Sequence, residues 1–267
     1  MKKFFLAFVF ILTLFSCNKT SAEDDVNDTS LAKVYLAEKL KIGVNGPFAP
    51  IYYMDKKKRV GYDIDLLNEV CAILDVTPEY IDIDWDEKDK LLATGEIDMI
   101  ASAFSKTSER EKEYGMSLPI IKNAQCIVVR AGEKRFKTFN DLETFSVACS
   151  VGSTAEDYVH RKVKSGFAFR VMSYKDINAA FIDLKAYEVD AVLIDIIVAN
   201  YFITSEQKEY YKILPLAILP EEYVFAFRKE DKALKDAVNS ALKIMAEDGT
   251  LPKITKKWFT TDISLIR

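Results

Sequence analysis

The chain has 267 residues, of which 49% are hydrophobic and 29% charged, so it can bury one large core or two small ones and is neither disordered nor fibrous. Its single histidine, His160, argues against histidine-rich metal sites and catalytic histidine relays. A formal net charge of −4 gives no basic field to attract a phosphate backbone, so we expect no nucleic-acid partner.

The N-terminal segment differs from the rest of the chain. Two lysines precede an apolar run from Phe4 to Phe15 that only Thr13 interrupts. As a helix this run would rise about 18 Å, well short of a hydrocarbon core of roughly 30 Å. We therefore predict a secretory signal peptide over residues 1–16 rather than a membrane-spanning helix.

The sequence Leu-Phe-Ser-Cys at 14–17 resembles the lipobox of bacterial lipoproteins, in which the signal is cleaved before the cysteine and the thiol is lipidated. This resemblance implies lipidation at Cys17; an ordinary signal peptide with an incidental cysteine is the alternative. Residues 17–32 begin polar and acidic without apolar periodicity, so we expect a lipidated cysteine followed by a flexible linker. The exported protein, periplasmic or on the cell surface, would be held at the membrane by its lipid.

Three cysteines remain once Cys17 is assigned to lipid: Cys71, Cys126 and Cys149. Their odd number and wide spacing match neither a zinc site nor a complete set of disulfides. Cys126 and Cys149 lie in apolar runs, where we expect small buried side chains. We expect no metal and no cofactor.

From about Leu31 onward, short apolar runs alternate with helical patterns. The predicted strands are 40–44, 80–83, 97–101, 125–130, 145–149, 168–172, 191–194, 213–217 and 223–227. The predicted helices are 63–74, 86–93, 155–163, 174–187, 196–204 and 232–248. Gly249 is the expected stop after the last helix. This alternation predicts an α/β fold of the doubly wound type.

Seven sequence blocks come in an order and spacing typical of one family. They are Pro47-Phe48-Ala49-Pro50, Gly61-Tyr62-Asp63-Ile64-Asp65-Leu66, Trp85-Asp86, and the blocks at 98–110, 151–158, 189–195 and 248–259. With these blocks the chain resembles, over about residues 34–259, the bacterial extracellular solute-binding proteins, family 3. These are the amino-acid receptors of ABC importers.

The resemblance implies a two-lobe periplasmic-binding-protein clamshell, each lobe an α/β sandwich, with two extended hinge crossovers. It implies that lobe one comprises residues 33–124 and 223–267, and lobe two residues 125–222. It further implies a monomeric, non-enzymatic protein that captures a free amino acid and delivers it to an ABC transporter permease.

The resemblance assigns Arg110 to the ligand carboxylate, which its guanidinium fork matches in a bidentate manner. A solvated arginine in a charged stretch is the alternative. Ser105, where we expect a short helix to begin, would add donors, or it would serve only as an N-cap. Ala103 can contribute only its backbone, so its carbonyl is a candidate acceptor for the ligand ammonium.

Three further candidates lie in the second lobe. Ser153 and Thr154 follow Gly152 at a predicted helix start, where backbone N–H groups would face an anion. The alternative is an ordinary helix cap. Asp195 ends an apolar strand, and the resemblance implies that it holds the ligand ammonium; an N-cap role for the next helix is the alternative.

The resemblance places Phe48 and Trp85 on either side of the ligand side chain, although ordinary core packing would also explain Phe48. Asn45 falls where receptors for basic amino acids in this family often carry an acid. The pocket motifs show no additional lysine or arginine that would suit an acidic ligand. We therefore expect a neutral polar or mid-sized apolar amino acid.

Two other functions remain open from the sequence. A dehydratase-type enzyme on the same fold would need a general acid, and we can name none because Asp195 is assigned to the ammonium and His160 is expected at the surface. A ligand sensor that passes a signal to a separate partner is the second. We find no further spanning helix or signalling domain in the sequence to support it.

Overall fold

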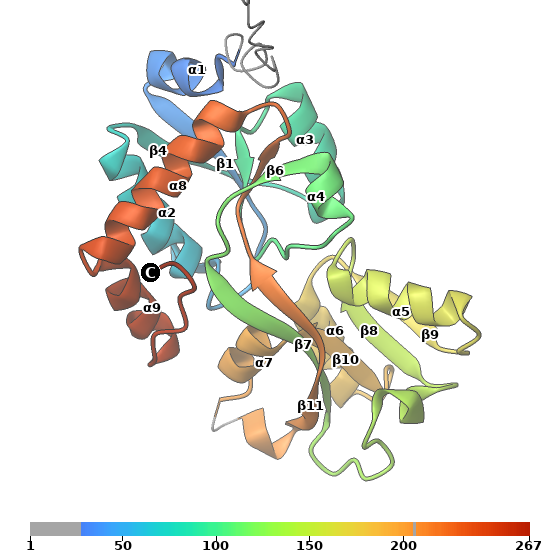
Figure 1. Ribbon diagram of the computed structural model, residues 1–267. Coiled ribbons are helices and arrows are strands. Elements are labelled where there is room, and N and C mark those ends of the chain that lie inside the picture. Colours follow the sequence, from blue (N-terminus) through green and yellow to red (C-terminus); the bar gives the residue numbers. More distant parts are fainter. Residues whose placement is uncertain (1–27, 205–206) are drawn as a thin grey trace, which may run out of the picture.

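The computed structural model describes residues 28–204 and 207–267, which form two α/β lobes joined by two long strands (Figure 1). The predicted signal peptide and Cys17 lie outside the described residues. Within the two described ranges, no helix has both the length and the apolar character needed to cross a membrane.

The first lobe is built on a five-stranded sheet with the order β4-β1-β5-β12-β6. β1 (Lys39–Val44) pairs in parallel with β4 (Thr77–Asp82) and β5 (Met99–Ile100). β12 (Ala226–Arg228) pairs antiparallel with β5 and with β6 (Tyr114–Met116). Because β12 comes from the last part of the chain, this sheet combines two distant segments of the sequence.

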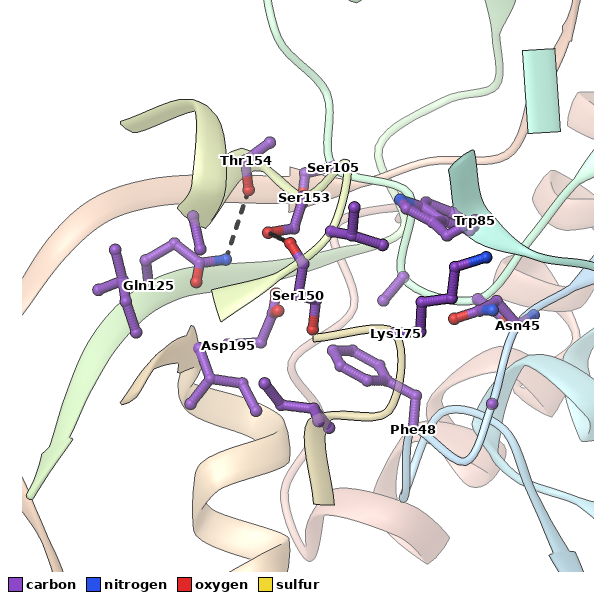
Figure 2. Close-up of a pocket in the computed structure, with 18 of the residues that line it drawn as sticks. Asn45, Phe48, Trp85, Ser105, Gln125, Ser150, Ser153, Thr154, Lys175 and Asp195 are labelled. Carbon is purple, nitrogen blue, oxygen red and sulfur yellow. Dashed lines mark hydrogen bonds between the residues drawn. The ribbon is translucent and has the colours of Figure 1, made fainter. Parts of the chain in front are cut away.

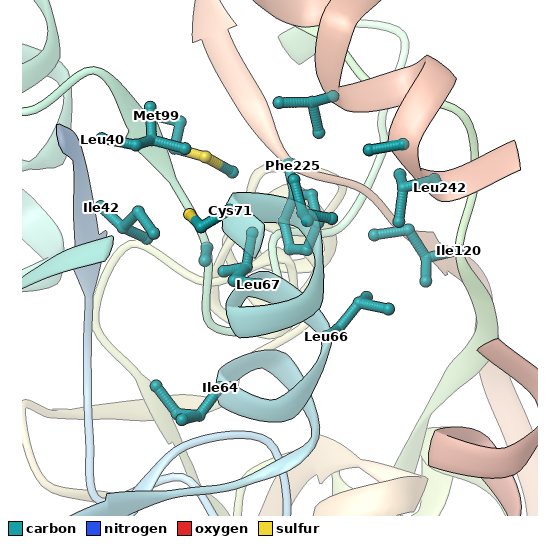
Figure 3. Packing of buried hydrophobic residues seen from close by; sticks show 14 of the residues in the cluster. Leu40, Ile42, Ile64, Leu66, Leu67, Cys71, Met99, Ile120, Phe225 and Leu242 are labelled. Atoms are coloured by element: carbon teal, nitrogen blue, oxygen red, sulfur yellow. The ribbon is translucent and has the colours of Figure 1, made fainter. Parts of the chain in front are cut away.

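Helices and a small hairpin complete the first lobe. They are α1 (Ser30–Ala37), β2 (Tyr53–Asp55), β3 (Lys58–Val60), α2 (Tyr62–Ile73), η1 (Trp85–Glu87), α3 (Lys88–Thr94), α4 (Arg110–Glu113), α8 (Lys232–Glu247) and α9 (Thr250–Phe259). The main core of the lobe lies between α2 and α8, where Leu67, Phe225 and Leu242 pack together (Figure 3). Each of these residues has at most 1% of its surface exposed. A smaller cluster lies beside α3 and contains Ile97 and Phe104.

The second lobe has a five-stranded sheet with the order β11-β7-β10-β8-β9. The strands are β7 (Ile121–Arg130), β8 (Ser146–Ser150), β9 (Arg170–Tyr174), β10 (Ala191–Asp195) and β11 (Tyr211–Tyr223). The helices are η2 (Phe139–Leu142), α5 (Thr154–Lys164), α6 (Ile177–Lys185), α7 (Ile196–Phe202) and η3 (Gln207–Glu209). Two separate apolar clusters, one with α6 and α7 and the other with α5 and η2, cover this sheet.

β7 and β11 connect the lobes. They pair antiparallel from Ile121 opposite Tyr223 to Arg130 opposite Tyr211, so β7 runs from the first lobe into the second and β11 returns to the first (Figure 1). The lobe boundaries predicted at 124/125 and 222/223 fall inside these continuous strands and stay predictions. The two-stranded connection is the region about which the lobes would move.

The predicted strands and helices each overlap an observed element of the same type, since buried apolar runs form the sheets and amphipathic segments cover them. Gly249 follows the C-cap of α8 with a φ of 85°, which confirms it as the stop of that helix. The strand predicted over 223–227 is two strands. β11 ends at Tyr223, and the Val224 N–H donates to the carbonyl of Phe104 instead of continuing the ladder.

The flexible linker predicted over 17–32 extends too far. α1 begins at Ser30, so residues 30–32 are helical. The carboxylate of Asp28 accepts the N–H groups of Ser30 and Ala233, and the Ser30 hydroxyl oxygen accepts the N–H of Leu234. These bonds attach the start of α1 to the start of α8, which the sequence of α1 alone did not reveal.

Candidate ligand-binding site

A pocket lies between the lobes and is lined by all nine residues that the sequence analysis assigned to ligand binding. They are Asn45, Phe48, Trp85, Ala103, Ser105, Arg110, Ser153, Thr154 and Asp195. Most follow the carboxyl ends of β1, β5, β8 and β10, which is where α/β sheets bind ligands. The structure brings these residues together, while their roles in binding stay predictions.

Arg110 carries the positive charge at the inner part of the pocket. Its Nη1 donates to the carbonyl of Ser105 (2.9 Å) and its Nη2 to the carbonyl of Gly152 in the other lobe (3.2 Å). The guanidinium lies 4.5 Å from the centre of the Phe104 ring. Burial lowers the pKa of Arg110, yet guanidinium stays charged in proteins. No described carboxylate forms an ion pair with it, so its charge is available to a bound anion.

Ser105 differs from its prediction. No helix begins there: α4 starts at Arg110, whose N–H donates to the hydroxyl of Thr107 (3.1 Å). Ser105 instead forms an isolated bridge with Tyr223, and its hydroxyl donates to Glu221 (2.9 Å). Ser105 is therefore part of the connection between the first lobe and β11. The expectation that a short helix begins at Ser105 was wrong, and with it the N-cap alternative, while its role toward a ligand stays a prediction.

Asp63 holds the loop that follows β5. Its Oδ2 accepts the N–H groups of Ser102 (2.8 Å) and Ala103 (3.3 Å), two residues with left-handed φ values of 67° and 60°. Burial raises the pKa of Asp63 to about 7. Because the N–H of Ala103 is used, its carbonyl is the backbone group left for a ligand. Asn45 lies beside this loop, donating its backbone N–H to the Ser102 hydroxyl (3.1 Å) and its side-chain amide to the carbonyl of Ile83 (2.8 Å).

Ser153 is the N-cap of α5. Its hydroxyl oxygen accepts the N–H of Glu156 (3.2 Å), and the hydroxyl donates to the carbonyl of Ser150 (2.6 Å). The hydroxyl of Thr154 donates to Glu221 and accepts from the amide of Gln125 (3.5 Å). Both hydroxyls thus already have partners in the protein. The start of α5 can therefore bind an anion through its first backbone N–H groups.

Asp195 is buried, with 8% of its surface exposed, and it precedes α7 without making a capping hydrogen bond. Its Oδ1 instead accepts from the hydroxyl of Tyr223 (2.7 Å) and from the amide of Asn123. Burial, followed by the charge of Glu221, raises the pKa of Asp195. No described lysine or arginine pairs with this carboxylate, which makes it a ready acceptor for a ligand ammonium.

Figure 2 shows the pocket from Asp195, Gln125 and Thr154 at one end to a group of larger side chains at the other. Trp85 and Phe48 belong to that second end. Trp85 packs on Phe104 with ring centres 6.0 Å apart, and Phe48 packs against the apolar clusters of both lobes. The core-packing alternative for Phe48 therefore describes part of its surroundings, while the ring still borders the pocket.

Lys175 also borders this second end, where the sequence analysis expected no cation. Its ammonium lies 2.9 Å from Asp84 and 3.5 Å from Asp86, across the gap between the lobes. The premise that no lysine or arginine accompanies the pocket is therefore wrong. Lys175 directly follows β9, which lies beside β8 in the sheet. The signal that the sequence offered was the position of Lys175 shortly after a predicted strand.

The fold and the pocket together define a two-lobe solute-binding protein with its pocket between the lobes. The family described as bacterial extracellular solute-binding proteins, family 3, matches residues 40–261. The chain belongs to this family, and the expected clamshell fold is confirmed.

Similar proteins bind amino acids. The L-cystine-binding protein TcyA of Bacillus subtilis (strain 168) is 31% identical over 274 residues, which cover 99% of this chain and 100% of TcyA. The structure of Tv2483 bound to L-arginine has a TM-score of 0.84 and 33% identity, covering 89% of this chain and 97% of that one. An ABC uptake transporter substrate-binding protein from Streptococcus pneumoniae, with bound histidine, has a TM-score of 0.83 and 28% identity, covering 90% and 99%.

These relatives confirm an amino-acid-binding protein of ABC transport that is not an enzyme. The expectation of a neutral ligand is not confirmed, because TcyA is named for L-cystine and the two solved structures hold arginine and histidine.

Proposed function

We propose that this protein captures an amino acid outside the cytoplasm for an ABC importer, and that the ligand carries both charges at the far end of its side chain, as L-cystine does. The observation that carries this proposal is the Asp84–Lys175 pair at the pocket end opposite Asp195. It replaces the neutral side chain expected from the sequence.

The inner end of the pocket, with Arg110, Thr154 and Asp195, suits the α-carboxylate and α-ammonium groups of any amino acid. A planar carboxylate needs a fork of donors, which Arg110 and the start of α5 supply. An ammonium needs acceptors close by, and Asp195 and the carbonyl of Ala103 are available. Both requirements are met within one pocket, so the inner end selects the amino-acid class and leaves the side chain to the outer end.

The outer end suits a second zwitterion. The side chains of Lys175 and Asp84 are 63% and 64% exposed, and exposed ion pairs contribute only about 0–1 kcal/mol. A ligand with a second ammonium and a second carboxylate can therefore exchange partners with this pair at little cost. Trp85 and Phe48 border this outer end and can contact the chain that joins the two charged groups.

A cationic side chain such as that of arginine would meet Asp84 favourably but Lys175 unfavourably. Lys175 is therefore the residue that separates a cystine-like ligand from a purely cationic one. Removing its charge should weaken the binding of L-cystine and leave the binding of L-arginine unchanged or stronger.

Titration calorimetry with L-cystine, L-arginine, L-histidine and L-glutamine tests the proposal. In Lys175→Ala we expect L-cystine to bind roughly 2- to 5-fold more weakly. The matched control is Lys164→Ala, which removes an exposed lysine of the same lobe from outside the pocket lining. If the wild type binds only L-glutamine of these four, the proposal of a second zwitterionic end is wrong. It is also wrong if Lys175→Ala leaves the ratio of the L-cystine and L-arginine affinities unchanged.

We further propose that the protein is exported and tethered through lipid on Cys17, as its lipobox-like sequence suggests. The family membership supports an extracytoplasmic location, since family 3 proteins are extracellular solute-binding proteins. A single lipid chain binds a membrane weakly and reversibly, so a stable tether requires more than one.

A further inference from the structure

Glu221 is a second buried carboxylate at the hinge, outside the lining of the ligand pocket. Only 6% of its surface is exposed. Its Oε2 accepts from the hydroxyl of Ser105 (2.9 Å) and the amides of Asn123 (2.8 Å) and Gln125 (3.0 Å), and its Oε1 accepts from the hydroxyl of Thr154. One carboxylate therefore joins Ser105 of the first lobe, Thr154 of the second lobe and the hinge strand β7.

Glu221 and Asp195 lie close together. The same amide nitrogen, Nδ2 of Asn123, donates one hydrogen bond to each of them. Both carboxylates are buried, and no described lysine or arginine forms an ion pair with either. Two neighbouring buried carboxylates without an ion-pair partner disfavour double ionisation, and burial together with the charge of Glu221 raises the pKa of Asp195.

We propose that Glu221 is a positioning residue of the ligand site: it fixes Ser105 and Thr154, and its charge keeps a proton on Asp195 that an incoming ligand ammonium displaces. Binding then converts the carboxylic acid of Asp195 into a carboxylate paired with the ammonium, and the proton goes to solvent. This inference rests on the proposed function, in which Asp195 receives the α-ammonium.

Other titratable groups surround the pair. Burial and the charge of Asp195 raise the pKa of Tyr223 well above its usual value, and burial raises the pKa of Cys126 to about 12, so both stay neutral near pH 7. Arg110 stays cationic. Asp63 is the remaining group that burial brings into the neutral range, with a pKa raised to about 7. The grooves on the outer side of Glu221 carry charges of both signs: Lys88, Asp89, Lys106, Glu109, Glu111, Glu113, Lys122, Asp157, Arg161 and Glu222.

Because Asp63 could also exchange protons, variants must be compared at one pH. Titration calorimetry with L-cystine at pH 6.5, in phosphate and in imidazole buffer, yields the number of protons released per ligand. For the wild type we expect release of about half a proton or more. In Glu221→Gln we expect release below about 0.2 proton and binding at least roughly tenfold weaker, since the new NH₂ group faces either the three donors now on Oε2 or the Thr154 hydroxyl now on Oε1. Glu222→Gln, the adjacent and more exposed residue of β11, should behave as the wild type.

The outcomes separate this inference from the proposed function. If the wild type binds L-cystine without releasing a proton, or if Glu221→Gln releases as much as the wild type, the inference is wrong and the function stands. If Asp63→Asn abolishes the release, its source is Asp63 and the inference is again wrong. Should Glu221→Gln fail to fold by circular dichroism, Glu221→Asp, which keeps the charge, must retain the release. If the wild type binds none of L-cystine, L-arginine and L-histidine, the proposed function fails and the inference with it.

Discussion

Substituting Arg110 by alanine tests the inner end of the pocket directly. The guanidinium bonds only to carbonyl oxygens, those of Ser105 and Gly152, and no described carboxylate neutralises it. Without Arg110, a bound ligand would bury its carboxylate with no cation beside it. Truncating one partner of a buried charge pair costs about 2–5 kcal/mol, which is a loss of affinity of roughly 30- to 5,000-fold.

The stability of the ligand-free protein should change little. Alanine removes two hydrogen bonds to carbonyls, each contributing about 1 kcal/mol, and also removes the cost of burying a cation without an ion pair. These effects oppose each other, so we expect the free energy of unfolding to change by less than about 1 kcal/mol. Arg110→Lys keeps the charge without the fork and should bind with intermediate affinity.

Titration calorimetry measures the affinity, and urea unfolding measures the stability. Arg161→Ala is the matched control, because Arg161 is an exposed arginine of α5 that lies outside the pocket lining. An Arg110→Ala variant that binds with wild-type affinity would refute the carboxylate assignment. A variant that loses affinity and several kcal/mol of stability together would show that Arg110 acts through the fold instead.

Two further predictions concern the anchor and a buried acid. If Cys17 is lipidated, Cys17→Ser should move the full-length protein from the membrane fraction to the soluble exported fraction, and membrane association that persists would contradict the tether. Asp63 has a folded-state pKa raised to about 7 from the usual 3.8, so the native state holds its proton more strongly than the unfolded state. The free energy of unfolding of the wild type should therefore fall, relative to Asp63→Asn, as pH rises from about 4 to 7. Urea unfolding measures it, and the same pH dependence of the free energy in both proteins would refute this.

The sequence was informative wherever one segment contained the whole signal. β8 and β10 are runs with almost no exposed residue, and such runs can be recognised without knowing their partners. The hairpin of β2 and β3 was missed because its turn contains Lys56 in the left-handed region, φ 57°, rather than the glycine or asparagine that marks most such turns. α1 was missed because its start is fixed by contacts with α8.

The candidate site follows the same rule. Ser105 and Arg110 lie in one motif, and Ser153 and Thr154 lie in another, so both could be predicted as groups. Lys175 faces Asp84 and Asp86 only because the two lobes meet, and no spacing along the chain encodes that meeting. The residues that sequence analysis missed are those whose role depends on the arrangement of the lobes.

Glu221 and Glu222 show this limit most sharply. Glutamate side chains are mostly exposed to solvent, and the sequence analysis assigned neither Glu221 nor Glu222 a role in ligand binding. In an extended strand, however, successive side chains point to opposite sides. The pairing of Glu221 with Asn123 turns Glu221 inward, to 6% exposure, while Glu222 stays more exposed. A slip of one residue in the pairing of β11 with β7 would exchange the two, so the register of the hinge decides which carboxylate lies beside Asp195.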